Sequence, residues 1–427
     1  MARKMKDSGI EWIGEIPEGW ETINPKALFA QRKDRASKGE RQLTSSQQYG
    51  ILYQDEYMEL TGSKVVTVEK DFDILKHVEA GDFVISMRSF QGGLEYSTKS
   101  GAISSAYVML VPNLELVYPR FYRWLLKSSV YIDALQRTTN MVRDGQAMRY
   151  SNFAQVRLFT LPLDEQKSRA DFLDVECSSI DKILFKTRSS IEEYKKLKQA
   201  VITQAVTKGV RGEREMKDSG VEWIGAIPKD WEIKRLKSFC TIVDCKNRTP
   251  DVFPDGKYTV VRTTCIKDCS FSYEGSYQTD TTNFKAWTLK GQPHKGDIFF
   301  TREAPVGEAC LVPNADNLCM GQRVMFFRPE DNSDARYIMY SIYGPLVREY
   351  IASKNSGSTV GHLKLGQVAC IPIFYCPPLE QKEIADYLDA KCAEIDKLIA
   401  KKEQLVKELE SYKKSLIYEV ITGKREV

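Results

Sequence analysis

Two segments, residues 161–209 and 377–424, carry apolar positions at the spacing of a long amphipathic helix. Successive positions alternate four and three residues apart over more than four heptads, which is typical of a coiled coil. In the first segment these are Leu173, Cys177, Ile180, Leu184, Thr187, Ile191, Tyr194, Lys198, Val201 and Ala205. The second repeats them 215 residues later as Leu388, Cys392, Ile395, Ile399, Lys402, Val406, Leu409, Lys413, Leu416 and Val420.

A helix of about 40 residues is about 60 Å long, so neither segment can bury its apolar seam against one compact domain. Each needs a partner of equal length, and the chain contains one. If a two-fold axis relates the halves of the chain, the two helices pair antiparallel. Lys198 and Lys413 occupy matched seam positions, where polar groups either fix the register or reach outward to water along apolar stems. Both alternatives stay open.

Between these helices the pattern changes to short runs typical of strands, mixed with shorter helices, in segments 20–160 and 231–376. The strand-like runs are Asp82–Ser86, Ala106–Val111, Asp297–Thr301 and Arg323–Phe327. Helical runs follow at Pro119–Lys127 and Asp334–Ser341. Because the order is the same in both segments, we expect one shared α+β fold.

The repeat also includes the start of each half. Residues 5–21 read MKDSGIEWIGEIPEGWE, and residues 216–232 read MKDSGVEWIGAIPKDWE. The frame therefore predicts a first domain at 1–160, a first helix at 161–209, a second domain at 216–376 and a second helix at 377–424. The start motifs either form a shared docking surface or, as we favour, pack on the domain and helix through Trp12, Trp20, Trp223 and Trp231.

Composition leaves room for two to three domains in 427 residues, with 42% apolar and 28% charged residues. No apolar run approaches the roughly 20 residues of a membrane span, and the N-terminus lacks the apolar core of a signal peptide. We therefore expect a cytoplasmic protein. Its ten cysteines include no Cys-x-x-Cys pair and it has three histidines, so neither a disulfide framework nor a zinc site is expected.

Catalytic motifs are scarce. The sequence has no phosphate-binding Gly-x-x-x-x-Gly-Lys-Ser/Thr, no Gly-x-Gly-x-x-Gly, no His-Glu-x-x-His and no Asn/Asp-Pro-Pro-aromatic tetrapeptide. Asp255 and Lys257 form an Asp-x-Lys element, but Asp-Gly there is more typical of a turn than of a nuclease metal site. We expect a binding protein without catalytic residues, metal or cofactor of its own.

The net charge of +4 is uninformative, but basic loops lie at residues 31–41 and 244–250. Polar loops also follow each Gly-Asp strand and precede each long helix. Arg, Asn and Gln suit base edges, whereas Lys, Ser and Thr suit phosphates. The candidate DNA-binding residues are Arg32, Lys33, Arg35, Arg88, Ser89, Gln91, Arg143, Gln146, Arg149, Lys246, Asn247, Arg248, Arg302, Gln322, Arg323, Asn355, Ser358 and His362.

These features together resemble the specificity subunit of a type I restriction–modification enzyme. The resemblance rests on the repeated Ser-Gly-(Ile/Val)-Glu-Trp-Ile-Gly-x-Ile-Pro-x-x-Trp motif, the Gly-Asp strands and the Pro-Leu-(Asp)-Glu-Gln-Lys helices, in order and twice. It implies two target-recognition domains joined by two conserved helices in an antiparallel coiled coil, with pseudo-two-fold symmetry. It also implies a bipartite, asymmetric DNA target whose half-site spacing the helices set.

The same resemblance implies partners: double-stranded DNA, two modification subunits that bind S-adenosylmethionine and methylate adenine, and restriction subunits that use ATP and Mg²⁺. Those cofactors would sit on the partners and not on this chain. The rival interpretation is a two-lobed protein scaffold or adaptor, which would not bind DNA in a salt-dependent way. An enzyme with an unrecognised motif is the third alternative.

Overall fold

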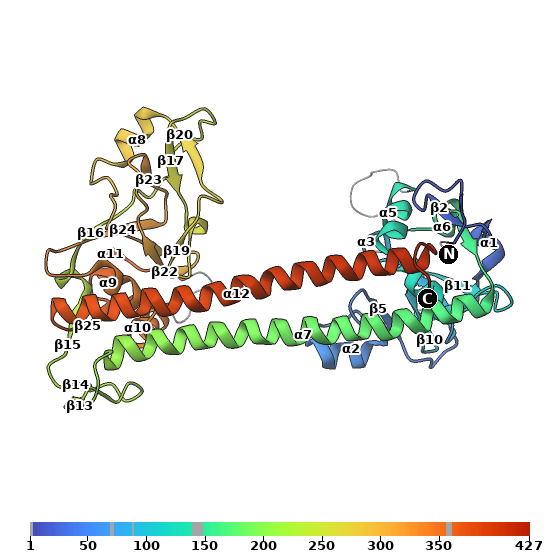
Figure 1. Cartoon of the computed structure of the whole chain (residues 1–427), viewed down its shortest axis with the longest axis horizontal. Coiled ribbons are helices and arrows are strands. Elements are labelled where there is room, and N and C mark those ends of the chain that lie inside the picture. The colour runs from blue at the N-terminus through green and yellow to red at the C-terminus, as the bar shows by residue number, and fades with distance from the viewer. Residues whose placement is uncertain (1–2, 69–71, 88, 139–147, 356–360) are drawn as a thin grey trace. The chain divides into compact units, whose positions relative to one another are not determined.

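The computed structural model describes residues 3–68, 72–87, 89–138, 148–355 and 361–427 (Figure 1). The chain divides into two compact units. Unit 1 comprises Met1–Arg188 and Gln404–Val427, and unit 2 comprises Ser189–Glu403. Two continuous helices, α7 (Leu163–Lys208) and α12 (Pro378–Ile421), each contribute one part to either unit. Each unit therefore contains a lobe of strands and short helices and a pair of long helical segments.

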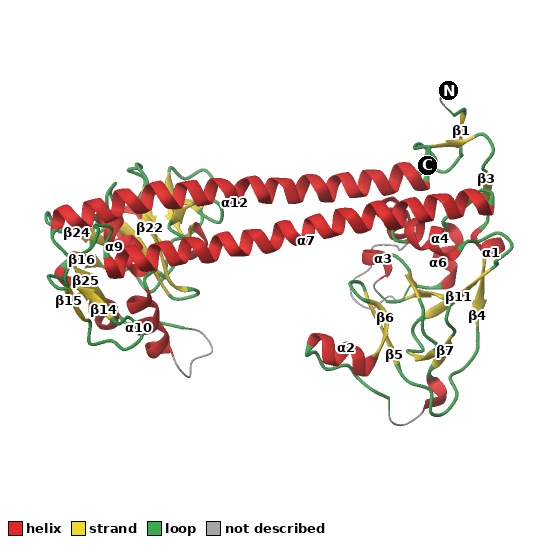
Figure 2. Ribbon diagram, turned by 60° about the horizontal axis from the view of Figure 1, so that its bottom comes forward, coloured by secondary structure: helices red, strands yellow, loops and turns green. Residues whose placement is uncertain are grey.

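Within each unit the segments of α7 and α12 lie side by side (Figures 1 and 2). They run antiparallel, because Asp181 pairs with Lys413 and Arg188 with Glu410 in unit 1. Seam positions are buried or half-buried, which confirms the heptad pattern. Helix α7 ends at Lys208, and the next residue, Gly209, has a φ of +75°, which favours glycine and is expected just after a helix C-terminus.

The two seam lysines, Lys198 and Lys413, keep their stems in the seam and also make polar contacts across the helix pair, so they share features of both alternatives that the sequence left open. Lys198 donates to Asp396 at 2.7 and 2.9 Å in unit 2, and Lys413 donates to Asp181 at 2.6 and 2.7 Å in unit 1. Their stems lie in the seam while their ammonium groups reach a carboxylate on the other helix. The two contacts are one pair repeated, because Asp396 and Lys413 are the residues 215 places after Asp181 and Lys198.

The core of each lobe is a four-stranded antiparallel sheet. Unit 1 has the order β4-β11-β8-β9, with β4 Phe29–Arg32, β8 Phe83–Ile85, β9 Glu95–Tyr96 and β11 Val108–Pro112. Unit 2 has the order β16-β24-β21-β22, with β16 Cys240–Val243, β21 Ile298–Arg302, β22 Val306–Leu311 and β24 Val324–Pro329. The expected strands are thus present with ends shifted by one or two residues, and the shared fold is confirmed.

Shorter helices connect each sheet to the long helices (Figure 2). In unit 1 they are α1 Pro25–Leu28, α3 Ser89–Gly92, α4 Pro119–Leu126, α5 Ser129–Arg137 and α6 Tyr150–Gln155. In unit 2 they are α9 Ala335–Ile342, α10 Pro345–Asn355 and α11 Leu365–Ala369. Matched carboxylates anchor α4 and α9, because Trp124 and Tyr340 donate to Asp174 and Asp389 at 2.8 and 2.9 Å.

Small outer sheets extend each lobe and differ between the units. Unit 1 has β5 Leu43–Ser46 with β6 Gly50–Tyr53, β7 Lys76–Val78 with β10 Gly101–Ile103, and helix α2 Gln54–Thr61. Unit 2 has β17 Tyr258–Val261 between β20 Tyr277–Thr279 and β23 Leu318–Met320, the hairpin β18 Ile266–Lys267 with β19 Ser270–Phe271, and helix α8 Thr281–Trp287. The outer sheets are therefore the divergent part of a shared frame.

The start motifs fold as hairpins, followed by strands that pair with the strand before each long helix. The hairpins are β1 Met5–Asp7 with β2 Glu15–Pro17, and β13 Met216–Asp218 with β14 Ala226–Pro228. The later pairs are β3 Glu21–Ile23 with β12 Leu158–Thr160, and β15 Glu232–Arg235 with β25 Pro372–Tyr375.

The start-motif tryptophans do not all pack as expected. Trp20 and Trp231 are fully buried, and Trp12 is half-buried against Tyr131. Trp223 is 63% exposed, so the expectation that it packs was wrong. The difference arises because α5 of unit 1 presents Tyr131 to the first motif.

Within the described residues, no helix is long and apolar enough to cross a membrane. The same part of the chain holds no group of three or more His, Cys, Asp or Glu side chains able to bind a metal ion. All ten cysteines are thiols.

Candidate nucleic-acid interface

The Gly-Asp motif before β8 and β21 builds the same turn in both units. The Asp82 side chain accepts from the backbone N–H of Glu79 at 3.0 Å, and that of Asp297 accepts from His294 at 2.9 Å. Each buried carboxylate also binds an arginine, but from a different strand. Asp82 binds Arg32 at the end of β4, and Asp297 binds Arg328 in β24.

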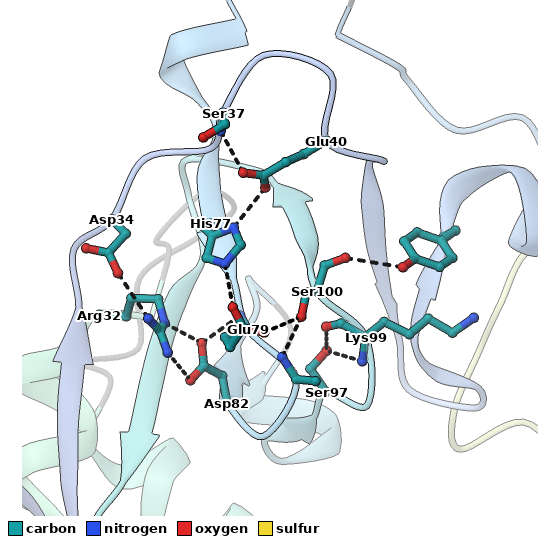
Figure 3. A network of polar contacts seen from close by, with 12 residues as sticks. Arg32, Asp34, Ser37, Glu40, His77, Glu79, Asp82, Ser97, Lys99 and Ser100 are labelled. Atoms are coloured by element: carbon teal, nitrogen blue, oxygen red, sulfur yellow. Dashed lines mark hydrogen bonds and ion pairs between the residues drawn. The ribbon is translucent and has the colours of Figure 1, made fainter.

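The basic loop of unit 1 begins at Arg32, whose guanidinium is already held by carboxylates. It donates to Asp82 at 2.6 and 3.1 Å and to Asp34 at 3.0 Å (Figure 3). The hydrogen bond with Asp82 is the main reason that the pKa of Arg32 is raised, against an opposing effect of burial. Lys33 and Arg35 are exposed in the loop that follows. The predicted residues of this loop thus divide into one anchor and two outward cations.

The other predicted residues of unit 1 lie on separate elements. Ser89 is buried at the start of α3, where its hydroxyl accepts from the N–H of Ser86 at 2.8 Å, and Gln91 is exposed on the same helix. Arg149 is exposed immediately before α6. Arg88, Arg143 and Gln146 lie outside the described residues.

In unit 2 the predicted residues gather around Arg302, the last residue of β21. This side chain is 8% exposed and donates to Asp244 at 3.1 and 3.2 Å and to Asn247 at 2.6 Å. Arg302 therefore fixes the loop after β16, which carries Lys246 and Arg248. Lys246 lies over the ring of Trp287 at 4.8 Å, and Arg248 is exposed.

The residues before β24 join this cluster. Gln322 is exposed before β24 and accepts from the Thr249 hydroxyl at 3.1 Å, which ties it to the loop after β16. The neighbouring Arg323 pairs with Glu303 at 3.3 Å, and Glu303 also contacts His362 at 3.3 Å. Asn355 ends α10, and Ser358 lies outside the described residues.

Sheet topology explains why these residues meet. Strands β4 and β8 are both antiparallel to β11, so their carboxyl ends lie at the same edge of the sheet. Strands β16 and β21 have the same relation to β24 in unit 2. In each unit this carboxyl edge presents cationic and amide side chains, which suit phosphates and base edges.

Two contributors were missed by the sequence reasoning. Trp287 lies under Lys246 and donates to the carbonyl of Arg248 at 3.1 Å, so α8 supports the basic loop of unit 2. In unit 1, Lys38 is exposed beside the predicted Lys33 and Arg35. Its place in a basic run was the available signal for Lys38. For Trp287 the sequence offered none, because it lies about 40 residues from the loop.

Comparison with known proteins points to one family. Residues 228–408 match the family model described as type I restriction modification DNA specificity domain. The chain is 22% identical over 433 residues to the putative type I restriction enzyme MjaX specificity subunit of Methanocaldococcus jannaschii, with 96% of this chain and 95% of that protein covered. It is 24% identical over 360 residues to the MjaVIII specificity subunit of that organism, with 81% and 80% covered.

A solved structure has the same fold. That structure comes from work on the structural basis of complex assembly and conformational transition in the type I R-M system. The TM-score is 0.69 at 15% identity, and the match covers 96% of this chain and 99% of that one.

Proposed function

Because this chain belongs to the specificity subunits of type I restriction–modification systems, we propose that its two lobes read the two halves of a bipartite DNA target. The family is non-catalytic, so this chain directs the chemistry of other subunits. Residues 1–160 and 216–376 are assigned to target recognition, and 161–209 and 377–424 to spacing. This assignment follows the repeat of the sequence.

The observation that carries this proposal is a shared frame with different edge residues. Both lobes hold a basic loop at the carboxyl edge of the same four-stranded sheet. The loop of unit 1 follows Arg32, whereas that of unit 2 is held by Arg302 and Trp287. Different side chains on one frame imply two different half-sites, and therefore an asymmetric target.

Roles at the edge follow from exposure and chemistry. We assign phosphate contacts to the exposed Lys33 and Arg248, because point charges position a protein on the duplex without reading sequence. We assign base contacts to Gln91, Gln322 and Arg323, whose amide or guanidinium groups are exposed. Arg32 and Arg302 act through the loops that they hold.

A flank of the helix pair offers a surface for partner subunits. Ile183 and Tyr412 of unit 1, and Leu197 and Leu398 of unit 2, each directly precede a seam residue, so the antiparallel register puts each pair on the same flank of the helices. These apolar side chains are 36–48% exposed. Arg188 and Glu410, which pair with each other, each directly follow a seam residue, and the heptad pattern therefore assigns them to the other flank. We assign this apolar flank to modification subunits, two copies of which match the repeat.

S-adenosylmethionine, ATP and Mg²⁺ then belong to the partners. The modification subunits supply adenine methylation, and restriction subunits supply translocation and cleavage. This chain contributes the choice of DNA sequence.

The experiment begins with methylation-sensitive sequencing of a host that expresses the chain with its modification subunits. The expected result is methylation at one bipartite motif. Binding selections over randomised half-sites then compare wild type with two variants. Arg323→Ala should cost about 1–3 kcal/mol and relax one position of the second half-site. Lys33→Ala should weaken binding evenly over all sequences and lower the salt slope by about one.

Arg248→Ala is the matched phosphate control in unit 2. It should weaken binding like Lys33→Ala while leaving the selected motif unchanged. Sequence-independent methylation, or DNA binding that does not respond to salt, would support a protein scaffold and refute target recognition.

A further inference from the structure

One histidine of unit 1 stands between two carboxylates (Figure 3). Nδ1 of His77 lies 2.8 Å from Oε2 of Glu40, and Nε2 lies 3.0 Å from Oε2 of Glu79. His77 belongs to β7, and its side chain is 21% exposed. Its two partners come from different parts of the chain, so one imidazole ring joins them.

Glu40 belongs to the basic loop that carries Lys33, Arg35 and Lys38. Its other oxygen accepts from the N–H of Ser37 at 2.7 Å, so this carboxylate closes the turn Ser37–Glu40 around Lys38. Glu79 belongs to the Gly-Asp turn, and its other oxygen accepts from the Ser100 hydroxyl at 2.6 Å. His77 therefore fastens the exposed loop to the rigid turn beside the sheet.

The backbone gives the loop fewer fixed points near its tip. The N–H of Ala36 donates to Leu75 at 3.1 Å, and the N–H of His77 donates to Asp34 at 3.0 Å. Both contacts precede Ser37. Beyond that residue, the turn is held by the N–H of Glu40, which donates to the Ser37 carbonyl at 3.2 Å, and by the side chain of Glu40 itself.

Two carboxylates on one imidazole require both ring nitrogens to donate, which only the protonated ring can do. Burial would lower the pKa of His77, but the hydrogen bonds from its ring to Glu40 and Glu79 raise it above its ordinary value. Hydrogen bonds from Ser100 and His77 lower the pKa of Glu79 to about 2. Glu79 thus stays ionised wherever His77 titrates.

Other charged groups near His77 leave this arrangement intact. Lys76, its neighbour in β7, donates to the carbonyl of Tyr107 at 2.6 Å, and Arg35 donates to the carbonyl of Ile74 at 2.9 Å. On the opposite side, Asp34 and Asp82 are paired with Arg32. The ionisable side chains in hydrogen-bonding contact with the ring, among the described residues, are therefore the two glutamates.

We propose that the imidazolium of His77 is a positioning residue for DNA, which holds the basic loop of unit 1 so that recognition of the first half-site weakens as pH rises. This inference rests on the proposed function. His77 itself needs no contact with DNA, because it acts through Glu40 on Lys38 and the cations beside it. Neutral His77 donates to one carboxylate and turns a lone pair toward the other, which releases the loop.

The sign follows from the raised pKa of His77. The contribution of the protonated ring is fully present below the ordinary histidine pKa and is lost as pH rises through the higher value in the folded protein. Unit 2 supplies an internal control, because Gln292 occupies the position of His77 and His294 that of Glu79. The second half-site should keep its affinity over the same range.

The test uses the chain with its modification subunits and a duplex carrying the motif found by methylation-sensitive sequencing. Affinity is measured from about pH 6 to pH 9 at fixed salt, with either half-site scrambled as the reference. For wild type, the factor by which scrambling the first half-site lowers the affinity should shrink about tenfold from low to high pH, as expected for a lost charge-assisted hydrogen bond. The corresponding factor for the second half-site should stay constant.

Two variants separate titration from structure. The glutamine of His77→Gln cannot donate to both carboxylates, so scrambling the first half-site should lower the affinity only slightly at every pH. Glu40→Gln keeps the contact without a proton, because the new amide N–H donates to neutral Nδ1 while its oxygen still accepts from Ser37. This variant should bind strongly over the whole range. His294→Gln, which changes an exposed residue of unit 2, is the matched control and should behave as wild type.

The outcomes are distinguishable. A complex that never discriminates the motif from scrambled DNA would refute target recognition itself. Normal discrimination with one common pH profile in wild type, His77→Gln and Glu40→Gln would overturn the role of His77. Loss of discrimination at both half-sites together as pH rises would assign the effect to another group.

Discussion

The two units differ in how a long helix meets a start motif. In unit 2 the chain runs from the end of α7 through residues 209–215 directly into the second start motif, so the two are joined covalently. In unit 1 the end of α12 meets the first start motif through noncovalent contacts. Lysines make a matched contact in both, because Lys424 donates to the carbonyl of Ile13 and Lys208 to that of Ile224, each at 3.1 Å.

Arg169 is a buried residue of this junction that has no charged counterpart at the matched position of unit 2. It is 1% exposed, and it donates to the carbonyls of Val420 and Arg425 at 2.8 and 2.9 Å and to Glu165 at 2.7 Å. The matching position in unit 2 is Ile384, which is fully buried among apolar side chains. The end of α12, which meets the start motif without a covalent link, is thus held by a buried guanidinium, whereas the covalent junction of unit 2 has an apolar residue at that position.

The largest effect is expected from Arg169→Leu, which gives unit 1 the apolar residue type of unit 2. The buried carbonyl of Val420, the part-buried carbonyl of Arg425 and Glu165 lose a charged donor, so unit 1 should lose about 3–5 kcal/mol of unfolding free energy. Hydrogen exchange of residues 5–21 and 416–427 measures this loss. Ile384→Leu is the control and should cost less than about 1.5 kcal/mol. Similar losses for the two variants would contradict the comparison.

The same site predicts a response to acid. Burial would raise the pKa of Glu165, but hydrogen bonds from Arg3, Arg169 and Trp20 lower it to about 2. The lowered pKa means that ionised Glu165 contributes roughly 3 kcal/mol to the free energy of unfolding. This contribution is present above about pH 4.5 and is lost as pH falls toward 2. Exchange protection of the first start motif should fall over that window. Glu165→Gln should remove this response, and an unchanged response would exclude Glu165 as its source.

The start-motif tryptophans offer a smaller contrast. Trp12 packs edge-on against Tyr131 with ring centroids 5.8 Å apart, whereas Trp223 is 63% exposed. Trp12→Ala should cost about 2 kcal/mol in urea unfolding, because it removes a half-buried aromatic pair. Trp223→Ala should change stability by less than about 0.5 kcal/mol. Equal costs would mean that Trp223 packs in solution.

The smallest difference is expected for the repeated ion pair. Lys198→Met and Lys413→Met each place an apolar side chain in the seam and leave a half-exposed aspartate in water. Their effects on unfolding free energy should agree within about 0.5 kcal/mol, because the two contacts have the same geometry. Urea unfolding of both variants gives the comparison. A larger gap would show that the surroundings in the two units distinguish one pair from the other.

Much of the frame was predictable because periodic patterns encode it locally. The heptad positions from Leu173 to Ala205 and from Leu388 to Val420 gave the long helices, and Gly209 marked the end of the first. The Gly-Asp motif located β8 and β21. The exposed Trp223 could not be predicted, because its neighbours in sequence nearly match those of Trp12, whereas Tyr131, which packs on Trp12, is distant in sequence.

For the candidate interface, the sequence identified residue types and loops but not the pairing of charges. Whether Arg32 or Lys33 faces outward depends on Asp82, which is 50 residues away. The support of Lys246 by Trp287, and the position of His77 between Glu40 and Glu79, likewise join distant parts of the chain. Residue-level DNA contacts therefore stay predictions.

The sequence by itself determined the duplicated frame, the two long helices and the basic loops, because repeats and periodicity are properties of neighbouring residues. Only the tertiary structure decided which part of α12 belongs to which lobe. Antiparallel pairing brings residues 404–427 to the first lobe, where Arg169 binds them. It also decided which cations are exposed at the candidate interface, because a buried carboxylate such as Asp82 binds whichever arginine the sheet brings to it.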